Sequence, residues 1–198
     1  MDAITLPERP AARRSGGPLR TIAVVAVTAL AIGAAAFLID QPTATGVTSL
    51  NLSGSIAAAP PAVGQVPPDF AVATIDGRTV RLSDFKGQPV WLTFGASWCP
   101  DCRAEAPDVE TAFQKYRARG LVVLAVFQED ASTATDYARR AGLTFTLGVD
   151  PDTQIASSYD VLGIPTHVFI GRDGKVQAFR IGGLKPDDID RYVQELLR

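Results

Sequence analysis

The sequence contains little sulfur and little histidine: its 198 residues include only two cysteines, one histidine and one methionine. Two cysteines cannot form the several bridges that hold small secreted scaffolds together. Two cysteines and one histidine cannot fill an ordinary four-ligand structural zinc site unless carboxylates contribute. Two cysteines are also fewer than the four thiolates that an iron–sulfur cluster needs. An excess of positive charge is lacking too. The 19 Lys and Arg residues face 21 Asp and Glu residues, which argues against a general nucleic-acid binder.

The N-terminal region contains one long run without charge. Residues 1–20 are polar and basic, and the 19 residues of 21–39 carry no charge. At 1.5 Å per residue, a helix over this run spans about 28 Å, close to the thickness of a hydrocarbon core. We therefore expect 1–20 to be a cytoplasmic tail and 21–39 a transmembrane anchor. The arginines of this region all precede the run, so the rest of the chain is expected outside the cytoplasmic membrane.

A cleaved signal peptide remains an alternative to the anchor. The small residues Ala34 and Ala36 resemble a cleavage site, but apolar residues still follow them. We favour the retained anchor, because the run is longer than the apolar core of an ordinary signal peptide. Residues 40–64 are rich in Ala, Thr, Ser, Pro and Gly and carry no charge after Asp40, which is typical of a flexible linker.

Residues 65–198 form the one expected globular domain. Apolar runs and turn residues predict strands at 70–73, 79–82, 90–94, 121–127, 144–147, 167–170 and 176–181. Helices are expected from the cysteine pair to about 119, and at 131–141, 154–159 and 186–197. Strands separated by helices require parallel crossovers, and the last two strands should form an antiparallel hairpin. The predicted fold is α/β: a mixed central sheet with helices on both faces and an N-terminal β-hairpin.

The two cysteines, Cys99 and Cys102, directly follow the predicted buried strand 90–94 and open the next helix. A helix N-terminus carries partial positive charge and unpaired N–H groups, which stabilise the nucleophilic thiolate. Pro100 suits the first helical turn. We expect Cys99 to be the exposed nucleophile and Cys102 the more buried thiol that resolves the mixed disulfide. The chain has no other cysteine, so an intramolecular disulfide can join only this pair.

The segment 94–107 (FGASWCPDCRAEAP), with GIPT at 163–166, resembles the thioredoxin-like superfamily. More narrowly, it is similar to the membrane-anchored TlpA/ResA-type thiol–disulfide oxidoreductases. The resemblance runs from about Val63 to the C-terminus, and it includes PDF at 68–70 and LSDFKG at 82–87. It implies a thioredoxin-like fold and a dithiol–disulfide cycle.

The resemblance also implies roles for single residues. Pro165 matches the family's cis-proline, which lies opposite the cysteine pair and, with Ile164, presents backbone to a bound peptide. Trp98 matches the aromatic residue before the first cysteine and is expected to contact substrate. Pro107 matches a proline that kinks the active-site helix. Glu105 matches an active-site glutamate that aids proton transfer; the alternative is a solvated acid in the first helical turn.

Three positions depart from the family pattern. Thr93 stands where thioredoxin keeps a buried aspartate, so Glu105 is the nearest candidate acid or base, with Asp101 also close. Gly95 replaces a bulky aromatic residue, which predicts looser packing between sheet and helix. Asp101 replaces a neutral residue between the cysteines, and its carboxylate disfavours the Cys99 thiolate. A less stabilised thiolate makes the pair a better reductant.

The expected function is an extracytoplasmic thiol–disulfide oxidoreductase that reduces protein disulfides through Cys99 and Cys102. The resemblance implies protein dithiol and disulfide substrates, apocytochrome c among them, and a membrane-embedded thiol carrier as electron donor. No cofactor or resident metal is expected.

Other functions remain open. One alternative is a thiol oxidase or isomerase of the same fold. A copper chaperone would use Cys99, Cys102 and His167, because thiolates and imidazole suit copper. A peroxidase of the peroxiredoxin type shares the segment 68–70 at its start.

Overall fold

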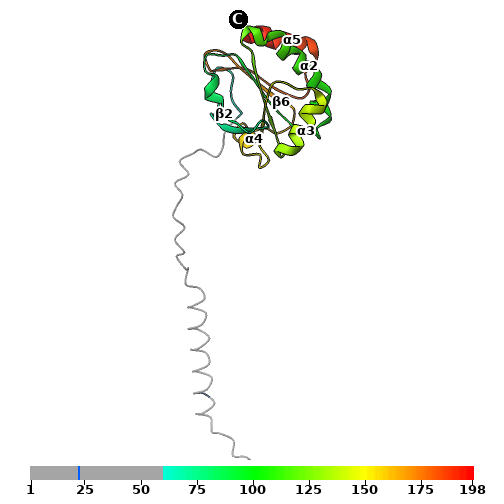
Figure 1. Cartoon of the computed structure of the whole chain (residues 1–198). Coiled ribbons are helices and arrows are strands. Elements are labelled where there is room, and N and C mark those ends of the chain that lie inside the picture. The colour runs from blue at the N-terminus through cyan, green and yellow to red at the C-terminus, as the bar shows by residue number, and fades with distance from the viewer. Residues whose placement is uncertain (1–21, 23–59) are drawn as a thin grey trace, which may run out of the picture. The chain divides into compact units, whose positions relative to one another are not determined.

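The computed structural model describes residue 22 and residues 60–198 (Figure 1). The predicted tail 1–20, the predicted anchor 21–39 apart from Ile22, and most of the predicted linker lie outside the described residues. Within the described part, no helix is both long and apolar enough to cross a membrane. The backbone of Gly64 and Gln65 exchanges hydrogen bonds with Val176, so the chain joins the domain there.

Strands and helices follow one another in the predicted order. The strands are β1 (Ala71–Thr74), β2 (Thr79–Arg81), β3 (Val90–Gly95), β4 (Val122–Phe127), β5 (Thr146–Val149), β6 (Thr166–Ile170) and β7 (Val176–Ile181). The α-helices are α2 (Pro100–Tyr116), α3 (Ala131–Ala141), α4 (Gln154–Ser158) and α5 (Pro186–Leu196). Two short 3-10 helices, η1 (Leu82–Phe85) and η2 (Arg117–Arg119), lie between them.

The seven strands form one mixed sheet in the order β2-β1-β5-β4-β3-β6-β7. Strands β3, β4 and β5 are parallel, and an antiparallel hairpin closes each edge. The expectation that every pair of strands separated by a helix is parallel is wrong for β6, which runs antiparallel to β3. Helix α4 has only five residues, too few to carry the chain back along the sheet, so β6 starts at the edge where β5 ends.

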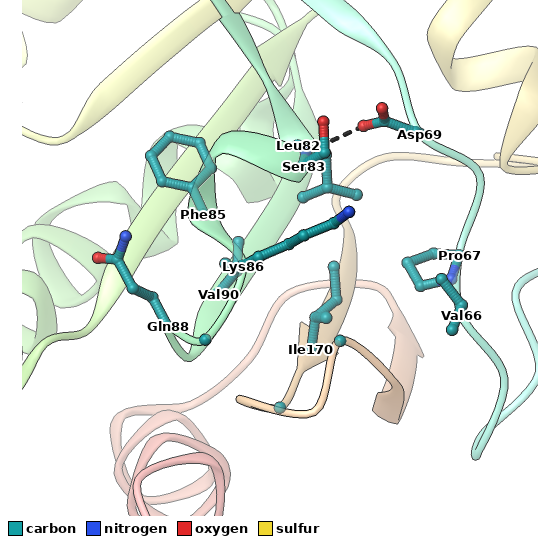
Figure 2. A pocket seen from close by; sticks show the side chains of 13 residues that line it. Val66, Pro67, Asp69, Leu82, Ser83, Phe85, Lys86, Gln88, Val90 and Ile170 are labelled. Carbon is teal, nitrogen blue, oxygen red and sulfur yellow. Dashed lines mark hydrogen bonds between the residues drawn. The ribbon is translucent and has the colours of Figure 1, made fainter.

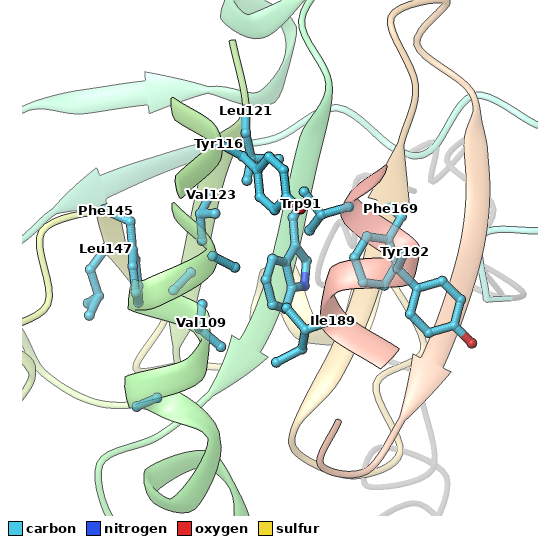
Figure 3. Close-up of a cluster of buried hydrophobic side chains, with 14 of the residues drawn as sticks. Trp91, Val109, Tyr116, Leu121, Val123, Phe145, Leu147, Phe169, Ile189 and Tyr192 are labelled. Atoms are coloured by element: carbon cyan, nitrogen blue, oxygen red, sulfur yellow. The ribbon is translucent and has the colours of Figure 1, made fainter. Parts of the chain in front are cut away.

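Two apolar clusters cover the two faces of the sheet. Successive side chains of β3 alternate between them: Trp91 enters one cluster, whereas Leu92 and Phe94 enter the other. The Trp91 cluster packs under α2, α3 and α5, and its ring stacks on Phe169, which in turn stacks on Tyr192 of α5 (Figure 3). Helix α4 and η1 cover the opposite face. The predicted layers are therefore present.

A largely apolar pocket of about 90 Å³ lies at the end of the sheet where β3 begins and β6 ends. Leu82, Val90 and Ile170 line it, and the Lys86 side chain extends along it (Figure 2). The cysteines follow the other end of β3, so this pocket is separate from them.

Strand β5 begins at Thr146, two residues later than predicted, because the preceding residues contact α2. The N–H and hydroxyl of Thr144 both donate to the Glu110 carboxylate of α2, at 2.8 and 2.6 Å. The Thr144 N–H is therefore not available for a hydrogen bond within the sheet. Partial burial raises the pKa of Glu110, but hydrogen bonds from Thr144 and Gln114 outweigh burial and leave this pKa below its ordinary value. The ionised carboxylate therefore ties α2 to the segment before β5.

We predict that Glu110→Gln lowers the free energy of unfolding by about 1 kcal/mol at pH 7, because the charged acceptor is lost. A carboxylate whose pKa is lowered by folding stabilises the protein above its unfolded-state pKa and loses this effect as the pH falls through the folded-state value. The deficit should therefore be constant above about pH 5 and shrink below pH 4. Urea denaturation across this range measures it, with the exposed Glu195→Gln as the matched control. A deficit that is equally large at pH 3 would contradict the assignment.

Candidate active site

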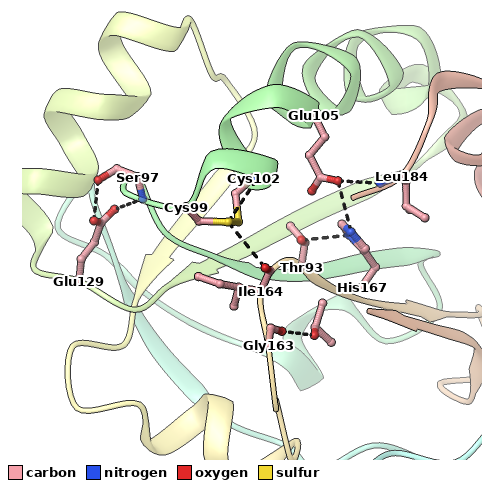
Figure 4. Close-up of a disulfide and its surroundings, with 11 residues drawn as sticks. Thr93, Ser97, Cys99, Cys102, Glu105, Glu129, Gly163, Ile164, His167 and Leu184 are labelled. Atoms are coloured by element: carbon pink, nitrogen blue, oxygen red, sulfur yellow. Dashed lines mark hydrogen bonds and ion pairs between the residues drawn. A yellow bond between two sulfur atoms is a disulfide. The ribbon is translucent and has the colours of Figure 1, made fainter. Parts of the chain in front are cut away.

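The Cys99–Cys102 pair forms a disulfide at the start of α2, with Cα atoms 5.3 Å apart (Figure 4). Cys99 is the N-cap residue and Pro100 occupies the first helical position, as the sequence predicted. The backbone N–H of Cys102 donates to Cys99 Sγ at 3.2 Å. This N–H belongs to the first turn, where it has no carbonyl partner within the helix, so it remains available to a Cys99 thiolate once the disulfide opens.

Both cysteines are buried in the disulfide form. Cys99 is 3% exposed and Cys102 is 7% exposed, so the expectation of an exposed Cys99 and a more buried Cys102 is wrong for this form. The Cys99 side chain turns inward to cap the helix, and its Sγ lies 3.7 Å from the carbonyl oxygen of Ile164. The neighbouring Trp98 is 63% exposed instead.

The segment opposite the disulfide contains the Ile164–Pro165 peptide bond, which is cis. This is the geometry that the resemblance implied for Pro165. Leu162, just before this segment, and Ile181, at the end of β7, are large exposed apolar residues, as is Trp98 beside Cys99. Large exposed apolar side chains thus lie next to Cys99 in the chain, before the cis-proline segment, and on β7 beside it.

Glu105 lies one helical turn after Cys102 and is 6% exposed. The alternative of a solvated first-turn acid is therefore wrong. Its Oε2 accepts a hydrogen bond from the Leu184 N–H at 3.0 Å and lies 3.5 Å from Nε2 of His167. The loop before α5 covers the carboxylate from outside, and β6 approaches it from inside.

A small cavity joins Glu105 to the disulfide. Its volume is about 20 Å³, and Thr93, Cys102, Glu105 and Pro165 are among the residues that line it. This volume is sufficient for one water molecule. On its other side, Glu105 borders an open groove between α2 and the loop that contains Lys185. The Glu105 carboxyl group thus borders both the cavity next to Cys102 and the solvent-filled groove.

His167 does not lie with the cysteines. It is fully buried, and its Nδ1 lies 3.3 Å from the indole nitrogen of Trp91 and 3.1 Å from the Thr93 hydroxyl. Its Nε2 faces Glu105. The copper ligand set of both cysteines and His167 is therefore not assembled, because both ring nitrogens are directed at other groups. In the part of the chain that the structure describes, no three His, Cys, Asp or Glu residues are grouped as metal ligands.

The looser packing expected from Gly95 is also wrong. Gly95 pairs with Phe127 of β4, and a Cβ at Gly95 would lie 3.3 Å from the Phe127 ring and 3.5 Å from Cys102 Sγ. The Phe127 ring fills the space that a larger side chain would take. The missing side chain therefore lets Cys102 approach the sheet directly.

One residue of the site, Glu129, was missed by the sequence reasoning. It lies two residues beyond β4 and is buried, and its carboxylate accepts hydrogen bonds from the Ser97 N–H at 3.0 Å and the Ser97 hydroxyl at 2.6 Å. These bonds hold the loop that leads into Cys99, on the side away from Glu105 (Figure 4). Polar residues that follow neighbouring parallel strands meet at one edge of the sheet, and this signal identifies Glu129.

Comparisons with known proteins agree with this site. Residues 63–179 match the model of the AhpC/TSA family. The thiol-disulfide oxidoreductase ResA of Geobacillus kaustophilus is 33% identical over 136 residues, which is 68% of this chain and 78% of the relative.

Two solved structures are similar as well. A thiol:disulfide interchange protein of the thioredoxin family from Chlorobium tepidum is 28% identical, with a TM-score of 0.60, and the match covers 72% of this chain and 100% of that one. A secreted Mycobacterium tuberculosis disulfide oxidoreductase homologous to E. coli DsbE is 25% identical, with a TM-score of 0.59, over 64% of this chain and 96% of that one. The chain belongs to the AhpC/TSA family, as a thioredoxin-like thiol–disulfide oxidoreductase of the ResA type.

Proposed function

We propose that this oxidoreductase reduces protein disulfides outside the cytoplasmic membrane, apocytochrome c awaiting haem attachment among them. The observation that carries the proposal is the disulfide at the start of α2, directly opposite the cis-proline segment. Asp101 between the two cysteines supports the reductive direction, because its charge disfavours the thiolate of the reduced form. The relatives named ResA and the DsbE homologue support the substrate class by analogy.

The reaction begins with the reduced protein. The Cys99 thiolate attacks one sulfur of the substrate disulfide, so that a mixed disulfide forms and one substrate thiolate leaves. Cys102 then gives its proton to the Glu105 carboxylate through a water in the shared cavity, and its thiolate attacks Cys99 Sγ. The second substrate thiolate leaves, and two electrons have passed from the protein dithiol to the substrate. A membrane-embedded thiol carrier reduces the Cys99–Cys102 disulfide again.

The substrate peptide would lie against the exposed apolar side chains of Trp98, Leu162 and Ile181. Trp98 directly precedes Cys99, and Leu162 and Ile181 lie before and beside the cis-proline segment, so burying their apolar surface favours a peptide bound near the disulfide. The backbone of Ile164 lies beside Cys99 and can pair with the peptide backbone. Because the contacts come from apolar surface and backbone, this arrangement suits an unfolded cysteine-containing segment.

We predict that Cys99→Ser lowers the rate of insulin reduction by dithiothreitol to the uncatalysed rate, because the nucleophile is lost. Cys102→Ser should instead accumulate a mixed disulfide with the substrate, since resolution fails. Turbidity of the insulin B chain measures the first outcome, and the mass of the protein under non-reducing conditions measures the second. Unchanged activity of Cys99→Ser would exclude this reaction.

We predict a reduction potential of about −270 mV or lower for the Cys99–Cys102 pair, and an increase of about 10–30 mV in Asp101→Asn. Removing the negative charge stabilises the reduced thiolate, so the variant becomes the weaker reductant. Equilibration with glutathione or dithiothreitol redox buffers gives both values, and Asp108→Asn, two helical turns further along α2, is the matched control. A value near −120 mV would indicate an oxidase, and a fall in the variant would contradict the role of Asp101.

The location rests on the uncharged run 21–39 and the arginines before it. We predict that alkaline phosphatase, which needs its own disulfides, is active when fused after residue 64 and inactive when fused after residue 20. The membrane fraction should retain the first fusion if the run stays as an anchor. An inactive fusion after residue 64 would place the domain in the cytoplasm instead.

A further inference from the structure

The pair formed by His167 and Glu105 is an unusual polar contact inside the domain. His167 is 0% exposed and Glu105 is 6% exposed, with 3.5 Å between Nε2 and Oε2. Among the residues that the structure describes, His167 Nε2 is the only buried side-chain nitrogen or oxygen without a hydrogen-bond partner. An unpartnered buried polar atom lowers stability, so its presence calls for an explanation in function.

The other ring nitrogen determines where the His167 proton lies. The indole N–H of Trp91 can only donate, and its nitrogen is 3.3 Å from Nδ1 of His167. Nδ1 therefore accepts, and the proton of the neutral ring is on Nε2, which lies 3.5 Å from Glu105 Oε2 without a hydrogen bond in the disulfide form. The hydroxyl of Thr93, 3.1 Å from Nδ1, can donate to the same lone pair. This arrangement makes His167 a neutral donor that faces a carboxylate.

The other charged and titratable groups around the pair lie further out. They include Asp101, Arg103 and Asp108 of α2, Tyr137 of α3, Lys185 in the loop before α5, and Arg180 of β7, which is hydrogen-bonded to Tyr192 of α5. In the described part of the chain, none of them forms an ion pair with Glu105 or His167. Among the described residues, the Leu184 N–H donates to the carboxylate, and Nε2 of His167 lies 3.5 Å from it without a hydrogen bond in this form.

We propose that His167 is a positioning residue whose Nε2–H holds the Glu105 carboxylate beside the cavity that it shares with Cys102. The inference rests on the proposed role of Glu105 as acceptor of the Cys102 proton. A neutral donor stabilises a carboxylate without placing a second charge in the interior, where an unpaired charge is costly.

The two half-reactions can be separated with Ellman's reagent, a symmetric aromatic disulfide. The Cys99 thiolate of the reduced protein attacks it and releases one coloured thiolate. Cys102 then loses its proton and attacks the mixed disulfide on Cys99, which releases the second. At high reagent concentration the first release is fast, and the second is independent of that concentration. Stopped-flow absorbance between pH 5 and 9 therefore follows the step in which Glu105 is proposed to act.

We expect His167→Leu to move the acid limb of the second release upward by about one pH unit, so that this step is about tenfold slower on that limb. The first release should change by less than about twofold. His167→Gln, whose amide offers both an acceptor and a donor, should bring the second release back to within about threefold. In a Glu105→Gln background, His167→Leu should have no further effect on this step, because its target is gone.

Several outcomes would overturn the proposal. If His167→Leu slows both releases equally, or slows the second equally in the Glu105→Gln background, His167 has only a structural role. If Glu105→Gln leaves the second release unchanged, the acid–base role of Glu105 fails and this inference fails with it. Two releases of thiolate would still establish the dithiol cycle, so the two failures are distinguishable.

A measurement on the unaltered side chain guards against a variant that does not fold. The chain contains a single histidine, so ¹⁵N-histidine labelling of the untagged protein gives one pair of ring nitrogen signals. We expect the shifts of a neutral ring protonated on Nε2 in the disulfide form, and a change of the Nε2 shift in Glu105→Gln. A ring protonated on Nδ1 would overturn the proposal, and so would ¹⁵N chemical shifts that are unchanged in Glu105→Gln.

Discussion

The parallel pairing of β3 with β4 is the constraint on which the active site depends. Because both strands end at the same edge, the residues that follow them meet: Ser97 after β3 is held by Glu129 after β4. The same pairing places the Phe127 ring against Gly95 and the Cys102 sulfur. Strand β6 begins at this edge too, antiparallel to β3, and brings the cis-proline opposite Cys99. The disulfide is thus fixed from three sides by strand ends.

The site combines this rigid frame with polar groups in an otherwise apolar layer. The face of β3 that contains Trp91 packs under α2 and α5, yet it also holds the imidazole of His167 beside the Glu105 carboxylate. Burial strengthens such contacts and makes an unmet hydrogen bond costly. The Glu105 carboxylate, the proposed proton acceptor, therefore lies beside the cavity next to Cys102 and accepts the Leu184 N–H, whereas Cys99 lies against the Ile164 carbonyl. Two cysteines three residues apart thereby acquire different surroundings.

Local signals in the sequence were sufficient to predict the bounds of elements whose ends are set by their own capping and turn residues. Helix α3 begins after the N-cap Asp130 and ends at Gly142 in the left-handed conformation, and both ends agree with the prediction. The strand β7 was also placed correctly, next to its Asp173-Gly174 turn. The strand β5 was shifted because Thr144 bonds to Glu110, 34 residues away, and no local pattern encodes that contact. The direction of β6 was missed for a similar reason, since it depends on the short connection through α4.

The sequence by itself determined the dithiol chemistry of this protein, because one pair of cysteines lies at a helix start and the helix N-terminus acts within its own first turn. The positions of Pro165 and Glu105 were implied by the resemblance to the thioredoxin-like family. Only the tertiary structure decided that Cys99 is covered, that Phe127 replaces the side chain missing at Gly95, and that Glu105 is buried against His167. Glu105 contacts Leu184, which is 79 residues later in the chain, and His167, which is 62 residues later. The loop before α5 and the strand β6 bring these two residues to it. Burial and charge environment are properties of such distant contacts, which residue spacing along the chain cannot specify.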